Sequence, residues 1–514
     1  MIDQQGKRRR AVTGAIIAAA LLPGAMAACT VGPDYRRPNA PVPAAYKEAR
    51  PQPGWKVSQP GVADNGAWWS VYYDPVLDGL ERRIDISNQN LKAAAAALQQ
   101  AEAIVAEARA GFFPTAAVNL SAQRSKAVGV TSSSGGAVAA GGRGIVSNLF
   151  SDQVAASWTP DLWGQIRRQV EAGVANAQAS AADLASARLS AQGTLAGDYL
   201  QLRIADELKQ LLDQSAKAYA ESLRITQNQY AAGIAAQSDV SQAEAQLRAT
   251  QAQAIATGVT RAEFEHAIAV LIGVPPAALT IAPTSFRIVV PDIPPGLPSA
   301  LLERRPDIAA AERAMAAANA EIGVQVAAFY PSITLTGSGG TQAAVFGQLF
   351  NASSGFWSIA ANLAETVFEG GLRNAQVQAA IAVFNQDLAN YRQTVLTAFQ
   401  QVEDQLAALR ILAEQARVQD AALAAANEAV RVLNNQYLAG TVAYTSVIVA
   451  EQTALTDAET ALTIRENQLV ASASLIQALG GGWNASQLPG REEIEQAAPL
   501  NFNPLPPVIP VQGQ

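Results

Sequence analysis

The sequence predicts an α+β membrane protein with an internal structural duplication, in which long helices lead into the strands of a transmembrane β-barrel. Three observations predict this fold class: a long tandem repeat, two very long alanine-rich stretches without proline, and four short stretches in which apolar and polar residues alternate. Repeats and hydrophobic periodicity are the primary structural signals in a sequence. Together they indicate one elongated body rather than the two or three ordinary domains that 514 residues could hold.

The first half of the chain returns in the second. Asn90 to Pro114 reads NLKAAAAALQQAEAIVAEARAGFFP, and Asp307 to Pro331 reads DIAAAERAMAAANAEIGVQVAAFYP. The turn at Tyr230 to Gly233 likewise returns at Tyr437 to Gly440. Because this period is far too long for a solenoid, we interpret the copies as two structural halves of one unit.

The chain divides into six predicted segments. They are a signal peptide, an extended N-terminal segment with a lipidated cysteine, a first repeat, a proline-rich linker, a second repeat and an extended C-terminal tail. Their boundaries are residues 1–28, 29–76, 77–273, 274–304, 305–482 and 483–514.

The N-terminus has the pattern of a secretory signal. Lys7 to Arg10 form the basic region, Ala11 to Leu22 the apolar core, and Ala27-Ala28 the small residues before a cleavage site. That core is too short to span a bilayer. Cys29, the only cysteine, follows directly. A lone cysteine cannot form an internal disulfide in an exported protein, so it is either a stray thiol or a lipidation site. Its position after small residues favours lipidation.

Two helices of unusual length are predicted. Gln165 to Ala232 and Leu372 to Ala439 contain no proline and little glycine. At 1.5 Å per residue, each helix would reach roughly 100 Å. The flanking stretches, about Leu77 to Ala110 and Ser238 to Ile272, are each near half that length, so two of them stacked end to end match one long helix. Helices alone would also fit a periplasmic coiled-coil scaffold.

The alternating stretches predict strands of a transmembrane β-barrel. Each stretch has one apolar and one polar face. Aromatic residues cluster at the ends of the stretches, as they do in the aromatic girdles at the two membrane interfaces of a β-barrel. The apolar positions are Val118, Leu120, Val154, Trp158, Ile333, Leu335, Trp357, Ile359 and Leu363. A soluble hairpin would show the same alternation, but two hairpins at duplicated positions in an exported chain favour the membrane. The Gly-, Ser- and Ala-rich stretch Ala127 to Leu149 is predicted to be an external loop.

Four strands cannot close a barrel, and open sheet edges do not occur in lipid. Two copies would give eight strands and three copies twelve. An eight-stranded barrel is filled by its own side chains, whereas twelve strands leave a lumen. The sequence therefore predicts a homotrimer in contact with outer-membrane lipid.

The composition argues against other function classes. Only 15% of the residues are charged and the net charge is −7, so there is no basic footprint for nucleic acid. The one histidine, His266, cannot supply a histidine-based metal cluster or a familiar catalytic triad. We expect no catalytic residue, no metal and no cofactor. The Arg304-Arg305 pair is most simply a helix-start or interface element.

Several motifs, taken together and in order, are similar to those of the TolC-type outer membrane factors. The chain resembles the lipoprotein branch that serves multidrug efflux pumps, over nearly the whole mature sequence. The matching motifs are Cys29 to Tyr35 with Pro38, Trp68-Trp69, Asp74-Pro75 with Leu77, Arg304 to Ile308, and the two Tyr-x-x-Gly turns. The resemblance implies a trimeric duct in which a barrel of helices continues a β-barrel of the outer membrane through the periplasm.

The resemblance also implies partners and a function. The duct would meet a periplasmic adaptor (membrane fusion) protein and an inner-membrane pump of the RND type, and would passively conduct drugs or other small molecules outward. Alternatives are the exit duct of a protein secretion system and a non-channel coiled-coil scaffold. In this family the pump rather than the duct selects the cargo.

The resemblance further implies a gate at the periplasmic tips, where Gly233 and Gly440 turn the helices and face the adaptor. In the family, a tyrosine and an arginine of the second tip bind an aspartate of the first. Tyr437 and Asp239 are present here, but Val442 stands in place of the arginine.

Ser446 and Val449 stand where aspartates narrow the lumen in the family. We therefore expect a Tyr437–Asp239 hydrogen bond and an apolar constriction lined by Thr445 and Val449. The alternative is that these are ordinary interface residues. The predicted gate comprises Asp239, Tyr437, Thr445, Ser446, Val449 and Gln452.

Overall fold

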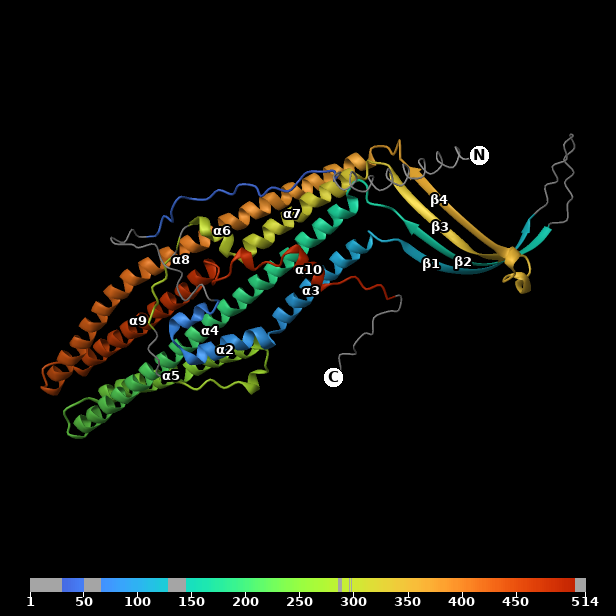
Figure 1. The fold of residues 1–514 in the computed structure, drawn as a ribbon. Coiled ribbons are helices and arrows are strands. Elements are labelled where there is room, and N and C mark those ends of the chain that lie inside the picture. Colours follow the sequence, from blue (N-terminus) through green and yellow to red (C-terminus); the bar gives the residue numbers. More distant parts are fainter. Residues whose placement is uncertain are drawn as a thin grey trace, which may run out of the picture.

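The computed structural model describes residues 30–49, 66–127, 145–284, 289–294, 296 and 298–503. These residues form an elongated body of long helices with a four-stranded sheet at one end (Figure 1). The predicted signal peptide and Cys29 lie outside the described residues.

The helices repeat in the same order in both halves. Those of the first half are α2 (Pro75–Ser87), α3 (Gln89–Ala110), α4 (Gln165–Ala231) and α5 (Gln237–Leu271). Those of the second half are α6 (Leu301–Arg304), α7 (Pro306–Ala327), α8 (Leu372–Leu438) and α9 (Tyr444–Ala478), followed by α10 (Arg491–Ala497). Short 3₁₀ turns lie at Trp68–Tyr72, Pro276–Ala278, Pro298–Ala300, Phe346–Gln348, Ala352–Ser354 and Ala485–Gln487. A strand pair follows α3 and another follows α7, which confirms the duplication.

The helix predicted over Leu77 to Ala110 is interrupted at Asn88, and this corrects the sequence prediction. Asn88 leaves the helical region with a ψ of 124°. Its side-chain oxygen accepts a hydrogen bond from the backbone N–H of Leu91 at 3.0 Å, and its amide donates to the carbonyl of Leu271 at 2.7 Å. Asparagine is a favoured N-cap because it satisfies a free N–H of the first turn. One helix therefore ends and another begins at this residue.

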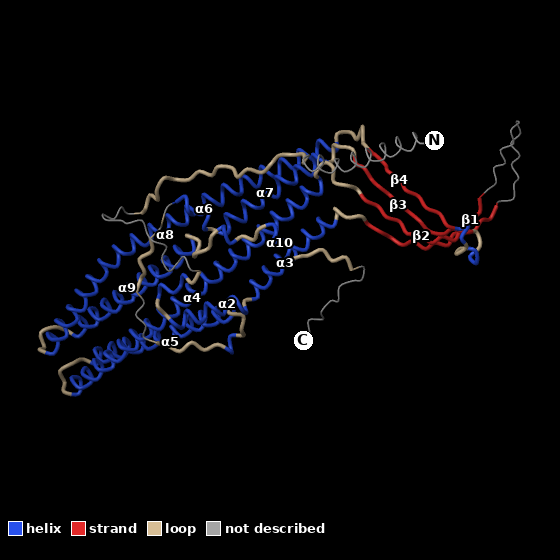
Figure 2. The backbone as a smooth tube through the Cα atoms, in the orientation of Figure 1, coloured by secondary structure: helices blue, strands red, loops and turns tan. Residues whose placement is uncertain are grey.

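The two long helices confirm the predicted lengths to within one residue. α4 and α8 each contain 67 residues, which corresponds to roughly 100 Å. Each begins after a glycine with positive φ, Gly164 at 85° and Gly371 at 91°, a conformation that glycine adopts freely. α4 packs along α3, α5 and α7, and α8 packs along α7 and α9. The hairpins α4–α5 and α8–α9 project together away from the sheet (Figures 1 and 2).

The sheet has the order β1-β2-β3-β4 and is antiparallel throughout. The strands are β1 (Thr115–Ala127), β2 (Ile145–Trp158), β3 (Ser332–Ala343) and β4 (Gly355–Ala364). The predicted strands are thus confirmed. The external loop predicted over Ala127 to Leu149 needs correction, because Ala127 belongs to β1 and residues 145–149 belong to β2. Residues 128–144 lie outside the described part of the chain.

The strand register separates an apolar face from a polar face. Val118 lies opposite Val154, and Gly337 lies opposite Ile359. The side chains one position along each strand belong to the other face. The large residues of the apolar face are exposed in the single protomer, as expected for a surface that meets lipid. They include Val118, Leu120, Val154, Trp357, Ile359 and Leu363.

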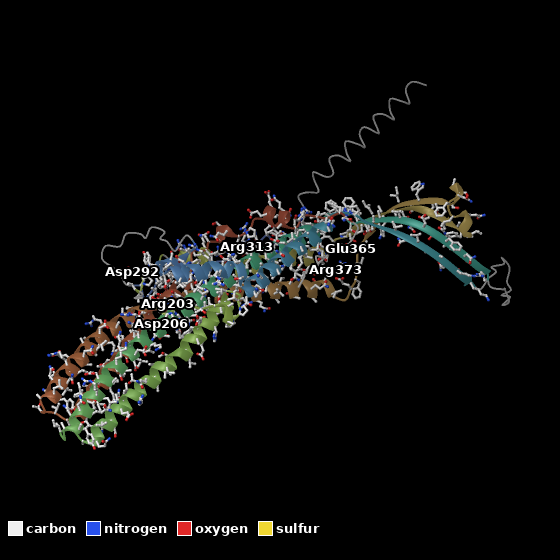
Figure 3. The ribbon with its side chains drawn as sticks, turned by 90° about the horizontal axis from the view of Figure 1, so that it is seen from below. Arg203, Asp206, Asp292, Arg313, Glu365 and Arg373 are labelled. Carbon is white, nitrogen blue, oxygen red and sulfur yellow. The ribbon has the colours of Figure 1, made fainter. Side chains whose placement is uncertain are left out.

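Buried charges connect the helices at the middle of the body (Figure 3). Arg203 and Asp206 of α4 form an ion pair at 3.2 Å with side chains that are almost fully buried. Asp206 also accepts a hydrogen bond from Arg261 of α5 at 2.7 Å. At the sheet end, Arg373 pairs with Glu365 at 3.3 Å. Because Arg203, Asp206 and Arg261 each have a partner of opposite charge, these three groups can stay ionised inside the body.

The segment 30–49 runs along α7 and α8 as an extended strap (Figure 1). The buried guanidinium of Arg168 donates to the carboxylate of Asp34 at 2.9 Å and to the carbonyl of Val31 at 3.2 Å. Tyr35 donates to Glu312 of α7 at 2.5 Å. The predicted extended tail differs from expectation, since α10 lies within it and packs on α3. None of the described helices is both long and apolar enough to cross a membrane.

Candidate functional site at the helical tips

The two hairpins end in matching turns at the end of the body farthest from the sheet (Figure 1). Gly233 and Gly440 adopt φ values of 74° and 73°. The N–H of each glycine donates to the carbonyl of the tyrosine three residues earlier, Tyr230 or Tyr437, at 2.9 Å. A residue with a Cβ would be strained at these φ values. Both predicted tip glycines therefore occupy the positions that reverse the chain.

Tyr437 does not bind Asp239 within the protomer, and this corrects the prediction. The Tyr437 hydroxyl donates instead to the side-chain oxygen of Gln229, in the last turn of α4. Asp239 accepts a hydrogen bond from the backbone N–H of Ala236 at 3.2 Å. A carboxylate in the first turn of a helix is stabilised by the free N–H groups there. Asp239 consequently turns back onto its own helix, and Gln229 is left to bind the tyrosine.

The contact between the hairpins near the tips combines neutral hydrogen bonds with an apolar cluster of Ala243, Tyr444 and Val447. We call it the tip seam. Besides the Tyr437–Gln229 bond, it contains Ser222 with Tyr444 at 2.8 Å, Tyr219 donating to the carbonyl of Glu451 at 3.3 Å, and Gln452 donating to Gln246 at 2.6 Å. The rings of Tyr437 and Tyr444 lie 5.1 Å apart. Each bond joins α4 or α5 to the second hairpin, so separating the hairpins breaks all four together.

Two predicted gate residues, Tyr437 and Gln452, thus belong to the tip seam. Thr445 and Val449 lie one turn apart on α9 and are both exposed, while Ser446 is half-buried. Val447, between them, is fully buried. A single protomer brings Thr445 and Val449 onto one exposed face, and the constriction that they are predicted to line stays a prediction.

Sequence reasoning missed Glu451, which lies in the seam. Burial raises the pKa of its carboxyl to about 7. Its Oε2 atom is buried without a hydrogen-bond partner among the described residues. The titratable groups beside it are Tyr219 of α4 and Tyr444 of α9. The available signal was that Glu451 is the only acidic residue in the first three turns of α9.

The polar face of the sheet is a second feature of functional interest. Its side chains in the described strands are serine, threonine, asparagine and glutamine with small or apolar residues, and none is ionisable. Ser121 and Ser151 are hydrogen-bonded across β1 and β2 at 2.7 Å, and Ser125 and Ser147 at 3.0 Å. This face can therefore contact water and polar solutes, and it presents no fixed charge to them.

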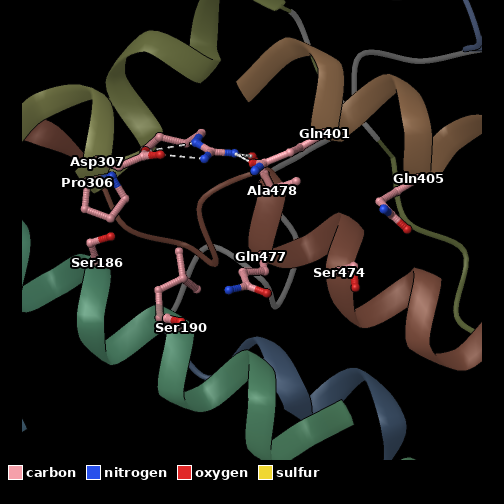
Figure 4. A pocket seen from close by; sticks show the side chains of 11 residues that line it. Ser186, Ser190, Pro306, Asp307, Gln401, Gln405, Ser474, Gln477 and Ala478 are labelled. Carbon is pink, nitrogen blue, oxygen red and sulfur yellow. Dashed lines mark hydrogen bonds and ion pairs between the residues drawn. The ribbon is translucent and has the colours of Figure 1, made fainter. Parts of the chain in front are cut away.

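A cavity of about 350 Å³ lies between α4, α7, α8 and α9 (Figure 4). Arg305 closes one side by donating to Asp307 at 2.5 Å and to Gln401 at 2.8 Å. It also donates to the carbonyl of Ala478 at 3.0 Å. The hydrogen bonds of the guanidinium therefore connect α7, α8 and α9, as expected for a structural role at the start of α7.

No described part of the chain brings together three metal-ligating side chains. His266, the one histidine of the sequence, is exposed on α5. Neither observation indicates a catalytic centre in the described residues.

Comparison with known proteins identifies relatives that match most of the chain. Residues 82–274 and 297–481 match the model of a family described as outer membrane efflux protein. The antibiotic efflux pump outer membrane protein ArpC of Pseudomonas putida is 28% identical, over 92% of this chain and 96% of its own length. The cation efflux system protein CusC of Escherichia coli is 29% identical, over 89% and 97%. The pyoverdine export outer membrane protein OpmQ of Pseudomonas aeruginosa is 30% identical, over 83% and 89%.

Solved structures agree with this result. The outer-membrane channel OprN superposes with a TM-score of 0.80 at 28% identity, covering 88% of this chain and 100% of that one. The open state of the MtrE outer membrane channel of Neisseria gonorrhoeae gives a TM-score of 0.76 at 28% identity, covering 89% and 99%. The helical body and the sheet are therefore arranged as in one protomer of these channels.

Proposed function

Since the chain belongs to the family of outer membrane efflux proteins, we propose that it works with a periplasmic adaptor (membrane fusion) protein and an inner-membrane pump of the RND type. Members of the family are trimeric outer-membrane channels that extend into the periplasm and serve efflux pumps. The protein is accordingly the exit duct of such a pump and belongs to a transport family rather than an enzyme family. What we propose is the class of its two partners, a membrane fusion adaptor and an RND-type pump.

The observation that supports the duct most directly is the sheet. Its outer strands, β1 and β4, each have one edge without a partner strand within the described chain. Unpaired edges are not tolerated in lipid. Three protomers close these edges into a twelve-stranded barrel with the apolar face outward and the polar face toward the lumen. The helices then continue the same duct away from the membrane.

We further propose that the cargo consists of small molecules and that the duct does not select among them. Relatives of similar identity are named for an antibiotic, a cation and pyoverdine, which differ widely in chemistry. An uncharged polar face has no fixed charge with which to discriminate among such solutes. A protein secretion duct is the alternative.

The tip seam is our candidate for the periplasmic gate, with the turns at Gly233 and Gly440 facing the adaptor. Thr445 and Val449 are proposed to form the neutral constriction. A neutral ring should bind divalent cations weakly, whereas a ring of carboxylates binds them well. Val449→Asp should therefore make single-channel conductance sensitive to millimolar Mg²⁺, and Val449→Thr serves as the uncharged control. An equal response of both variants would place the constriction elsewhere.

Site-specific photo-crosslinking in intact cells tests the partners. A photoreactive residue at Ile234, exposed at the first tip, should capture an adaptor of the RND-pump type, identified by mass spectrometry. The same residue at Phe368, near the sheet, is the control and should not capture it. Capture of a secretion-system adaptor at Ile234 would instead establish the alternative function.

We propose that Cys29 becomes the lipidated N-terminus of the mature protein and adds a second membrane signal to the barrel. A single acyl chain alone gives only marginal binding to membranes. Cys29→Ser should therefore leave an assembled trimer in the outer membrane. Mass spectrometry that finds Cys29 unmodified on membrane-extracted protein would exclude the modification.

A further inference from the structure

The ionisable side chains of the described strands all lie on the apolar, lipid-facing side of the sheet. They are Arg124 and Lys126 of β1 and Asp152 of β2. Arg124 lies opposite Asn148 and Lys126 opposite Val146. These residues have the same parity along the strands as Leu120 and Val154, so they share the apolar face. Charges facing outward from a barrel are costly inside the hydrocarbon but not beyond it.

The register places the two cations beyond the hydrocarbon region. β3 and β4 pair with each other only as far as Thr341 and Gly355, while β1 and β2 continue to the pair Ala127 and Ile145. An aromatic contact, Phe150 against Phe346 at 5.6 Å, lies where β3 ends. Aromatic residues mark the membrane interface. The two basic residues therefore stand just past the belt, on the side away from the helices.

The two cations are also available for a ligand. Neither forms an ion pair with another described residue. Both side chains are exposed, as is that of Asn148. Being two residues apart on one strand, Arg124 and Lys126 lie about 7 Å from each other. Asp152 is opposite Leu120, four residues nearer the helices than Arg124, and is too distant to serve as the counter-ion.

We propose that Arg124, Lys126 and Asn148 form a binding site for the phosphorylated glycolipid headgroup of the outer leaflet of the outer membrane. The inference rests on the membrane position given by the proposed function. A guanidinium binds a phosphate through two parallel hydrogen bonds, a nearby ammonium adds a second charge, and the amide of Asn148 can donate to a sugar or phosphate oxygen. The chain as a whole carries a net charge of −7, so this pair of cations is a local exception that fits an anionic lipid.

Lipid retention by the intact trimer tests the site. Trimers are reconstituted into nanodiscs that contain phosphatidylethanolamine with either lipid A or phosphatidylglycerol, then released and analysed by native mass spectrometry. The wild-type protein should retain lipid A at least fivefold over phosphatidylglycerol. The double variant Arg124→Gln/Lys126→Gln should lose most of that preference. Equal retention of lipid A by wild type and double variant would overturn the proposal, as would equal retention of the two lipids by the wild type.

A shifted variant provides a matched control. Adding Gln123→Arg and Ser125→Lys to the double variant restores the charge but moves it to the opposite face, because neighbouring residues of a strand point to opposite sides. Lipid A retention should stay low in this protein. Recovery would mean that net charge rather than the outward site holds the lipid, and would overturn the proposal. Trimer assembly and conductance are measured on the same samples, so a failure of the duct itself is seen separately.

Discussion

Glu81 offers a test of how much stability the helical body loses by burying a carboxyl group. The side chain is fully buried on the face of α2 that also carries Leu77 and Ile84. Both of its carboxyl oxygens are buried without a hydrogen-bond partner among the described residues. Burial raises the pKa of the carboxyl from 4.5 to about 9, with smaller contributions from Asp85 and Asp78. The folded protein therefore holds this group in its neutral form at pH 7.

Keeping the proton costs free energy that can be approximated. In the unfolded chain the carboxyl ionises above its ordinary pKa of 4.5, whereas in the folded chain it stays protonated up to about 9. Stability therefore falls as the pH rises between these values and is constant outside them. At about 1.4 kcal/mol per pH unit, the loss at pH 7, which lies 2.5 units above the ordinary pKa of 4.5, is about 3.5 kcal/mol per protomer. Methionine has a similar volume and no charge, so Glu81→Met should recover most of that amount.

Hydrogen exchange of the α2 amides measures the effect where it arises. Protection factors, corrected for intrinsic exchange rates, should fall from pH 5.5 to pH 8 in the wild-type trimer and stay constant in Glu81→Met. Glu107→Gln, a change of an exposed acid on α3, is the control and should follow the wild type. A variant that is less protected than the wild type at pH 7, or one that keeps the pH trend, would refute the reasoning. It would show that Glu81 has a partner in the trimer.

Three further predictions concern the tip seam and the strap. Because the pKa of Glu451 is raised to about 7, its ionisation at higher pH places a charge in the seam, so the open probability in planar bilayers should rise from pH 6 to pH 8. Glu451→Gln should remove this pH dependence, and persistence of the trend would exclude Glu451 as its source. Tyr437→Phe should raise the open probability severalfold through the loss of about 1 kcal/mol from its bond with Gln229. Asp239→Ala should do so less, and the reverse order would restore the originally predicted pair. Arg168→Ala removes the buried guanidinium that binds Asp34 and the carbonyl of Val31 and should free the strap for limited proteolysis; unchanged cleavage would contradict that role.

The architecture was predictable because its signals are local. Proline-free alanine-rich stretches gave α4 and α8, glycines gave the turns, and a period of two gave the strands, each without knowledge of the packing. The break at Asn88 was also within reach, since asparagine is a favoured N-cap. It was missed because the helical pattern on both sides is strong. The first residues of β2, from Ile145, were predicted as loop because they adjoin a glycine- and serine-rich sequence, and such a composition indicates a loop.

The partners across the tip seam were not predictable from the sequence. Whether Tyr437 meets Asp239 or Gln229 depends on how the second hairpin is rotated against α4, and hydrophobic periodicity does not fix that angle closely in alanine-rich helices. The burial of Glu451 depends on the same rotation. The strap contacts of Arg168 are equally remote, since they join residues more than a hundred positions apart. Side-chain pairing between elements is therefore the information that needed a structure.

The neutral chemistry of the tip seam bears on how a partner can open it. A typical hydrogen bond contributes about 0.5–1.5 kcal/mol to stability, so the four seam bonds together amount to about 2–6 kcal/mol per protomer. Shifting a two-state equilibrium from 1:99 to 99:1 requires about 5.5 kcal/mol of differential binding. One docking interface can supply this, because a partner needs only to bind the separated hairpins more tightly than the joined ones. Salt bridges at these positions would have made the opening depend on ionic strength. With neutral partners, the seam should respond to an adaptor and to the protonation of Glu451, and little to salt.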